Sequence, residues 1–89
     1  MEVCNRGDYA TALQEFRPLA EQGDAKAQNN LGTMYGTGRG VPINDVRAYM
    51  WYSLAKAQGH EAAADNLEIA KSLMTPAQIT KAQALASEM

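Results

Sequence analysis

Apolar residues recur at helical spacing along most of the chain. In the first segment they lie three or four residues apart, which places them on one face of an amphipathic helix. That face comprises Tyr9, Ala12, Leu13, Phe16, Leu19 and Ala20. The segments near 24–36, 45–58, 61–73 and 76–88 carry similar patterns, and no stretch alternates in the way of a strand. The pattern predicts five helices, the first near 9–22, and an all-α fold.

Polar residues mark the expected helix starts. Side chains able to cap an amino end precede the first three helices, at Asp8, Asp24 and Asn44. The clearest start signal is at 75–78, where Thr75 caps, Pro76 takes the first helical position and Gln78 completes a capping box. Pro18 interrupts the first helix and predicts a bend there. The connections are short, so consecutive helices are expected to be antiparallel neighbours.

The inward faces of these helices predict the core. Four large side chains are expected to be buried, namely Leu31, Tyr35, Trp51 and Leu67. Gly32 has no side chain and is expected to lie close against a neighbouring helix. In the fourth predicted helix the inward residues are Ala64, Leu67, Ala70 and Leu73. The core therefore combines a few large side chains with small residues that allow close approach.

The chain also contains an internal repeat. The stretch Leu19-Ala20-Glu21-Gln22-Gly23 recurs as Ala55-Lys56-Ala57-Gln58-Gly59, an offset of 36 residues. Further matches at the same offset pair Phe16 with Tyr52 and Leu31 with Leu67. A period of this length fits one pair of helices with two short turns. The repeat therefore predicts stacked helical hairpins.

One of these units resembles a known family. Its first half reads Ala25-x-Ala27-Gln28-x-x-Leu31-Gly32-x-x-Tyr35-x-x-Gly38-x-Gly40-Val41-Pro42. Its second half, after Asn44, reads Ala48-x-x-Trp51-Tyr52-x-x-Ala55-x-x-Gln58-Gly59. This pattern resembles the Sel-one-like repeat, a relative of the tetratricopeptide repeat, and the carboxyl-terminal stretch resembles that of short bacterial members. The resemblance implies a right-handed α/α superhelix, or solenoid, of antiparallel helix pairs, and an adaptor role.

The resemblance also divides the chain. We expect one repeat domain over 1–89, with a half unit at 7–23, a complete unit at 24–59, a degenerate half unit at 60–75 and a capping helix at 76–89. The array is expected to stop there because Glu68 stands where Gly32 stood and Lys71 where Tyr35 stood. Cysteine-rich secreted members pair cysteines within each unit. Cys4 is the single cysteine of this chain, so that disulfide arrangement does not transfer.

The amino-acid composition excludes some classes of function. Apolar residues make up 46% of the chain and its net charge is −2, which excludes a strongly basic nucleic-acid binder. No run of 18 apolar residues occurs, so membrane insertion is not expected. The sequence leaves two cellular locations open: the cytoplasm, or an exported location if a leader has been omitted from this sequence. Partners are therefore expected to be proteins or peptides.

Several motifs have both a chemical and a structural interpretation. The Gly36-x-Gly38-x-Gly40 segment follows a helix and not a strand, so it predicts a tight interhelical loop and not a phosphate cradle. His60 lacks the further ligands that a metal needs, so it is expected to start a helix. The aromatic residues Tyr49, Trp51 and Tyr52 are expected to fill the core and not to form a stacking platform. We expect no catalytic, cofactor-binding or metal-binding residues, and we expect that the chain is not an enzyme.

The candidate partner site is the concave wall that the resemblance implies. In tetratricopeptide-like arrays the first helix of each pair lines this wall. The outward positions there predict a strip made of Lys26, Asn29, Thr33, Met34, Asp65 and Ile69. A mixed polar and apolar strip suits a peptide or a helix laid in a groove, although an ordinary wet surface would have the same composition.

Three functions remain open from the sequence. The first is an interaction module that docks a partner protein or peptide on the concave face. The second is an enzyme or a binder of small ligands, such as the peptidoglycan-like compounds linked to some secreted relatives. The third is a structural fragment that completes a larger array or dimer. The helix at 9–22 lacks a pairing partner, so it is expected to self-associate or to pack on a segment absent from this sequence.

Overall fold

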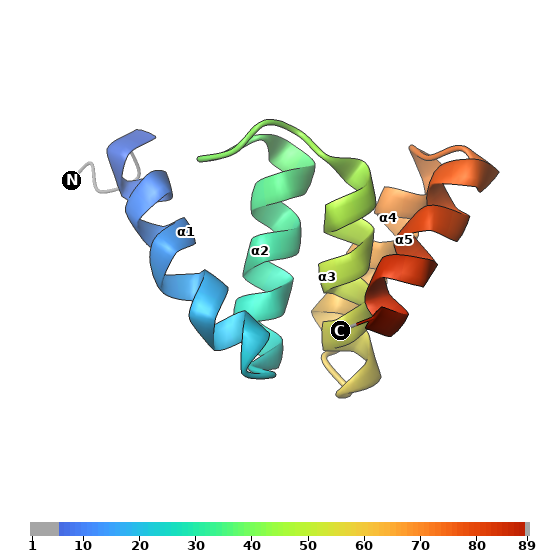
Figure 1. The fold of residues 1–89 in the computed structure, drawn as a ribbon, viewed down its shortest axis with the longest axis horizontal. Helices are drawn as coiled ribbons and strands as arrows, with labels where there is room; N and C mark the ends of the chain where they lie inside the picture. The colour runs from blue at the N-terminus through green and yellow to red at the C-terminus, as the bar shows by residue number, and fades with distance from the viewer. Residues whose placement is uncertain (1–5, 89) are drawn as a thin grey trace.

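Residues 6–88 fold into five helices, which confirms the all-α prediction (Figure 1). The computed structural model describes residues 6–88. Its helices are α1 (Arg6–Glu21), α2 (Ala25–Thr37), α3 (Asp45–Ala57), α4 (Glu61–Ser72) and α5 (Pro76–Glu88). No strand occurs between residues 6 and 88. The last four helices begin and end within one or two residues of the predicted bounds, because caps and glycines mark those ends locally.

The amino-terminal helix departs from the prediction. It begins at Arg6, so Asp8 lies inside the helix and does not cap it. The helix is assigned without interruption across Pro18, which lies in its last turns. Its apolar pattern starts only at Tyr9, whereas the backbone is already helical before that pattern begins. Cys4 lies outside the described residues.

The predicted caps at the other amino ends are confirmed. Asp24 accepts a hydrogen bond from the Ala27 amide at 3.1 Å, and Asn44 does the same for Arg47. Before α5 the capping box is complete, since the Gln78 amide donates to the Thr75 hydroxyl and the Thr75 amide donates to the Gln78 side chain. These bonds satisfy amides that have no partner inside the helix.

His60 is a cap as well. Its Nδ1 accepts a hydrogen bond from the Ala63 amide at 3.2 Å, at the start of α4. This confirms the interpretation of His60 as a helix-start residue. An imidazole can serve in this position because an unprotonated ring nitrogen accepts a hydrogen bond as a carboxylate oxygen does.

The glycine-rich segment is an interhelical loop, as predicted. Gly38 takes a left-handed conformation with φ of 76°, and its amide donates to the Met34 carbonyl at 2.9 Å. Gly40 also has a positive φ, of 81°, and a Cβ there would lie 3.0 Å from the Tyr9 carbonyl oxygen. The loop therefore passes directly over α1. Arg39 is exposed, and its guanidinium lies 5.4 Å from the centre of the Tyr9 ring, which is a cation–π contact.

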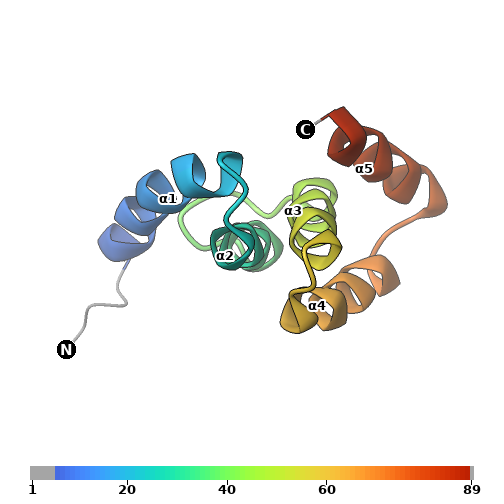
Figure 2. The same ribbon diagram turned by 90° about the horizontal axis from the view of Figure 1, so that it is seen from below.

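The helices pack mostly in chain order, with one exception. Helix α1 lies on α2, α2 on α3, and α3 on α4, whereas α5 packs mainly against α3 and not against α4. Figure 2 shows α2 and α4 toward one side of the array and α1 and α5 toward the other. The expectation that all consecutive helices are packed neighbours is therefore wrong for the last pair. The fully buried Ala82 shows why, since its small side chain lets α5 approach α3 closely.

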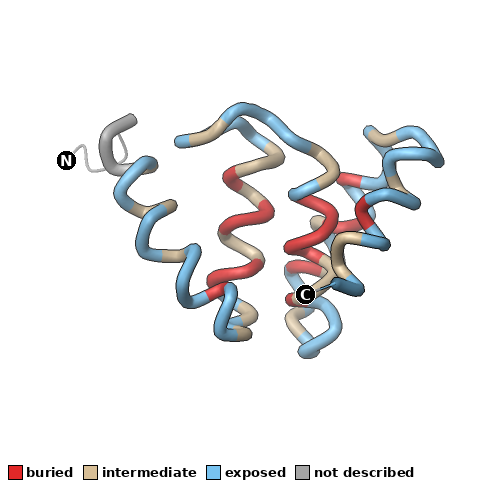
Figure 3. The backbone as a smooth tube through the Cα atoms, viewed as in Figure 1, coloured by how far each residue is buried: buried red, intermediate tan, exposed pale blue. Residues whose placement is uncertain are grey.

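The core consists of two clusters of buried side chains, and the half-buried Tyr35 packs against both. Figure 3 shows that many of the buried positions lie along α2 and α3. One cluster joins α1, α2 and α3 around Leu31 and Trp51, and the other joins α3, α4 and α5 around Tyr49, Tyr52 and Leu67. The predicted burial of Leu31, Trp51 and Leu67 is confirmed. Tyr35 is only half-buried. Burial of all three candidate platform aromatics confirms that they fill the core.

Gly32 lies in close contact with the neighbouring helix α3. A Cβ built at Gly32 would lie 2.6 Å from ring atoms of Tyr52 on α3, much closer than any real side chain permits. The predicted close approach is therefore confirmed, and the partner is an aromatic ring seated on the bare backbone of α2.

Two apolar residues expected to face inward are exposed. Leu73 is 67% exposed and Leu19 is 43% exposed. Helix α4 ends at Ser72, so Leu73 is already its carboxyl-terminal cap, and α5 then turns toward α3 and leaves Leu73 uncovered. Leu19 lies in the last turn of α1, which packs on α2 alone among the helices it touches closely.

Candidate partner-binding groove

A groove lies between α2 and α4, with α3 beneath it. Its cavity has a volume of about 200 Å³, and most of its lining is apolar. Ala48 and Tyr52 from α3 form the floor together with Ala70 from α4. Helices α2 and α4 touch only slightly, which leaves this space open above α3.

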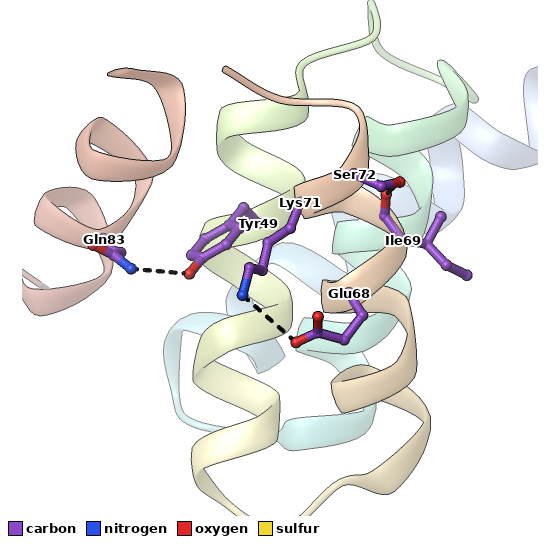
Figure 4. A network of polar contacts seen from close by, with 6 residues as sticks. All are labelled: Tyr49, Glu68, Ile69, Lys71, Ser72 and Gln83. Atoms are coloured by element: carbon purple, nitrogen blue, oxygen red, sulfur yellow. Dashed lines mark hydrogen bonds and ion pairs between the residues drawn. The ribbon is translucent and has the colours of Figure 1, made fainter. Parts of the chain in front are cut away.

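One wall of the groove is formed by two exposed apolar side chains. Ile69 is 61% exposed and Leu73 is 67% exposed. They are four residues apart along α4 and its cap, which places both on one side of the helix. Figure 4 shows Ile69 pointing away from the helix axis into open space. Two large neighbouring apolar side chains left in water are a feature of binding surfaces.

The opposite wall and the rim are polar. Thr33 accepts a hydrogen bond from the Tyr52 hydroxyl at 3.0 Å, and Asn66 donates to the Asn29 side chain at 3.1 Å. Burial raises the pKa of the Tyr52 phenol above its ordinary value of 10.0, and the hydrogen bond with Thr33 opposes part of that rise. Asp45 is the single charged residue in the lining. The rim is therefore polar but mostly uncharged.

The structure brings part of the predicted strip together at this groove. Thr33 and Ile69 line it from opposite helices. Asn29 bonds to Asn66, which lines it. Lys26 and Asp65 are exposed but do not contribute to the lining.

Met34 is the member of the strip that the structure corrects. It is only 6% exposed and packs in the core with Leu31 and Trp51, so it offers no surface to a partner. Its side chain lies on the inward face of α2, one residue away from the exposed edge that Thr33 occupies. Met34 was placed on the concave wall by aligning α2 with the repeat pattern. An error of one residue in such an alignment rotates the side chain by about 100° around the helix, which is enough to turn it inward.

The predicted strip missed most of the lining, including Leu73, Asn66 and Asp45. Leu73 was placed inward because it continues the apolar spacing of α4. The signal that could have identified it is the short connection to Thr75, which ends the helix before Leu73 can pack. Asn66 and Asp45 carried no signal, because polar residues of these types occupy most solvated positions.

A polar network joins the end of α1, the start of α2 and the end of α3. Gln28 is a buried polar residue, and its amide group donates to the Ala20 carbonyl at 3.0 Å. Its oxygen accepts from the Gln58 side chain at 2.9 Å. The network links α1, α2 and α3 in one chain of bonds, which keeps the α2–α3 pair that carries the groove in register.

Tyr49 is tied to the last helix. Its hydroxyl accepts a hydrogen bond from Gln83 at 3.2 Å (Figure 4). Nearby on the surface of α4, Lys71 and Glu68 form an ion pair at 3.7 Å. Both partners are well exposed, so this pair contributes little to stability.

Within the described residues, no cluster of three histidine, cysteine, aspartate or glutamate side chains is arranged to hold a metal ion. None of the described helices has both the length and the apolar composition needed to cross a bilayer.

The family comparison identifies the central helix pair. The sequence model of the Sel1 repeat matches residues 25–60, which span α2, the glycine-rich loop and α3. The chain contains a Sel1 repeat. Sel1 repeats are generally protein-interaction scaffolds and are typically non-catalytic. The groove thus lies between the first helix of the Sel1 repeat and the helix that follows the repeat.

A curated relative agrees with this assignment. The chain is 41% identical over 59 residues to the sel1-like repeat-containing protein L21 of Acanthamoeba polyphaga mimivirus. The matched segment covers 62% of this chain and 11% of that viral protein. The chain therefore spans a small part of the length of the relative that it matches.

Proposed function

We propose that this Sel1-repeat chain is an interaction module that holds an amphipathic helix of a partner protein in the groove between α2 and α4. The observation that carries the proposal is the exposed pair Ile69 and Leu73 beside an apolar floor. Side chains four residues apart on one helix match an apolar stripe of the same spacing on another helix.

The size of the groove favours a side chain over a free small molecule. A volume of about 200 Å³ accommodates one or two apolar side chains. Pockets for small organic ligands usually reach roughly 300–1,000 Å³ and enclose most of the ligand. Asp45 at the rim adds a preference for a basic residue next to the apolar stripe.

A display library of short helical peptides tests the proposal. Peptides that bind the wild-type chain are selected first. Those that also bind the variant Ile69→Ser/Leu73→Ser are then discarded, because they bind outside the groove. Calorimetry then measures the selected peptides. Each serine substitution is expected to weaken binding about tenfold or more, because about 1.5 kcal/mol or more of apolar burial is lost.

Leu19→Ser is the matched control. It removes an exposed leucine from α1, away from the groove, and should leave peptide affinity unchanged. The proposal fails if removing the peptides that bind the double variant leaves none that bind the wild type, or if Leu19→Ser weakens the selected peptides as much as the groove substitutions do. It also fails if the selected peptides lack an apolar stripe.

A further inference from the structure

A second, polar pocket lies on the other side of the α2–α3 pair, between α1 and α3. Arg17 and Glu21 come from α1, Tyr35 from α2, and Arg47 and Trp51 from α3. The cavity has a volume of about 350 Å³, and most of its lining is polar. It shares no lining residue with the groove between α2 and α4.

The pocket has a local excess of positive charge. Two guanidinium groups face a single carboxylate, that of Glu21, on a chain whose net charge is −2. Among the side chains of residues 9–88, no ion pair joins either arginine to Glu21. One positive charge is therefore left without a counter-ion in the pocket.

Two of the residues that line the pocket carry a hydrogen-bond donor with no acceptor among the described residues. Arg17 donates to the Tyr35 hydroxyl at 3.3 Å, which leaves the proton of that hydroxyl free to donate. The Trp51 indole N–H is buried and has no hydrogen-bond partner in the described part of the chain. A buried donor without an acceptor is uncommon in folded proteins and is a reason to look for a missing acceptor.

We propose that this pocket binds a carboxylate presented by an acidic peptide segment of a protein. Arginine side chains from two helices would hold the carboxylate from both sides, and arginine–carboxylate pairs are among the strongest polar contacts in proteins. The Tyr35 hydroxyl supplies a third donor. The Trp51 N–H is buried in the free structure, so it is not counted among the donors that the carboxylate contacts.

The charge of the pocket selects the kind of anion. A carboxylate carries a single negative charge, which matches the single unpaired positive charge. A phosphate group carries more, and Glu21 would repel it more strongly. Arg17, Glu21 and Arg47 are all exposed, so the pocket opens to solvent and leaves room for the peptide backbone outside. This site is independent of the proposed helix-binding groove.

The Trp51 indole provides the readout, since Trp51 is the single tryptophan of the chain. Its N–H gives one identifiable signal in a proton–nitrogen NMR spectrum of the full chain. We expect a short blocked peptide rich in glutamate to shift that signal saturably, whereas the same peptide with glutamines should not. Inorganic phosphate, titrated separately, is expected to bind more weakly than the glutamate peptide.

Matched variants test the residues. Arg47→Gln should weaken binding about tenfold, because a charge-assisted hydrogen bond is lost. Arg39→Gln makes the same charge change at an exposed residue outside the lining of the pocket and should alter affinity by less than about twofold, because an exposed charge without direct contact contributes little. Glu21→Gln removes the repelling carboxylate and should tighten binding about threefold or more.

Two results would overturn the proposal. Equal weakening by Arg39→Gln and Arg47→Gln would show that the peptide is attracted without a specific site. Tighter binding of inorganic phosphate than of the glutamate peptide would show an anion site of a different kind. Thermal melts of each variant confirm that a loss of binding is not a loss of the fold.

Discussion

At the scale of single residues, the contact between Gly32 and Tyr52 holds the two helices of the Sel1 repeat together. The Tyr52 ring cannot move away easily, because it is buried and its hydroxyl is bonded to Thr33. The absence of one side chain thus decides how closely α2 and α3 approach. This was predictable from the sequence, since glycine inside a helix costs stability unless close packing compensates.

We expect Gly32→Ala to destabilise the chain and Gly36→Ala to stabilise it. Alanine gains about 1 kcal/mol over glycine in a helix. At Gly32 the added Cβ would lie 2.6 Å from the Tyr52 ring, and such overpacking costs about 1–3 kcal/mol, for a net loss of up to about 2 kcal/mol. At Gly36 the nearest atom is 3.7 Å away, so the gain remains. Denaturant unfolding measures both changes, and equal effects would contradict the assigned role of Gly32.

Tyr52 also predicts a pH dependence. Its folded-state pKa is raised, so the folded chain holds the phenolic proton more tightly than the unfolded chain does. This contribution to stability is present below the ordinary pKa of 10.0 and is lost as pH rises through the folded-state value. Tyr52→Phe should therefore lose stability less steeply above pH 10 than the wild type does. Urea unfolding across this range checks the slope, and identical slopes would show that Tyr52 does not contribute.

At the scale of helices, the ends are determined locally. Four amino-terminal caps are made by side chains within three residues of the amides that they bind. Such bonds depend on neighbouring sequence alone, and three of them were predicted as caps and the fourth, His60, as a helix start. The start of α1 was misplaced because helical backbone extends beyond the apolar pattern used to detect it.

The capping box of α5 gives a prediction at this scale. Thr75→Ala removes the acceptor of the Gln78 amide and should cost about 1 kcal/mol. Thr80→Ala is the matched control, since Thr80 is an exposed threonine inside the same helix. It should be neutral or slightly stabilising, because alanine has the higher helix propensity. Thermal unfolding that ranks the two variants the other way would contradict the role of the cap.

At the scale of the whole molecule, the array is least supported at its first and last helices. Helix α1 packs closely on α2 alone and α5 on α3 alone, whereas α3 contacts α2, α4 and α5. Tyr9, Leu13 and Phe16 of α1 are only half-buried. In a repeat array the stability of each helix comes from its neighbours, so a helix with one neighbour opens most easily.

Native-state hydrogen exchange tests this difference. Amides of α1 should exchange faster than those of α2 and α3, because local opening of α1 breaks a single helix interface. Sedimentation at rising concentration then shows whether the half-buried face of α1 associates with a second copy. Protection of α1 equal to that of the middle pair would show that α1 is not a weak edge.

The two proposed sites also belong to this scale, because each collects side chains from several helices. The groove joins α2, α3 and α4, and the polar pocket joins α1, α2 and α3. The repeat pattern indicated the helix faces that carry Thr33 and Ile69. It gave no sign of the convergence of Arg17 and Arg47 on Trp51, since these residues are polar or aromatic at positions that fit an ordinary helix surface.

The sequence by itself determined the helices, their caps, the loop of the Sel1 repeat and most of the core. Each of these depends on apolar periodicity or on hydrogen bonds between close neighbours in the chain. The packing of α5 against α3, which leaves Leu73 exposed beside the groove, could be seen only in the folded chain. The tertiary structure also shows that Met34 is buried and that Arg17 and Arg47 line one pocket with Tyr35. The direction in which one helix packs on another depends on the fit of side chains distant in sequence, which no local pattern records.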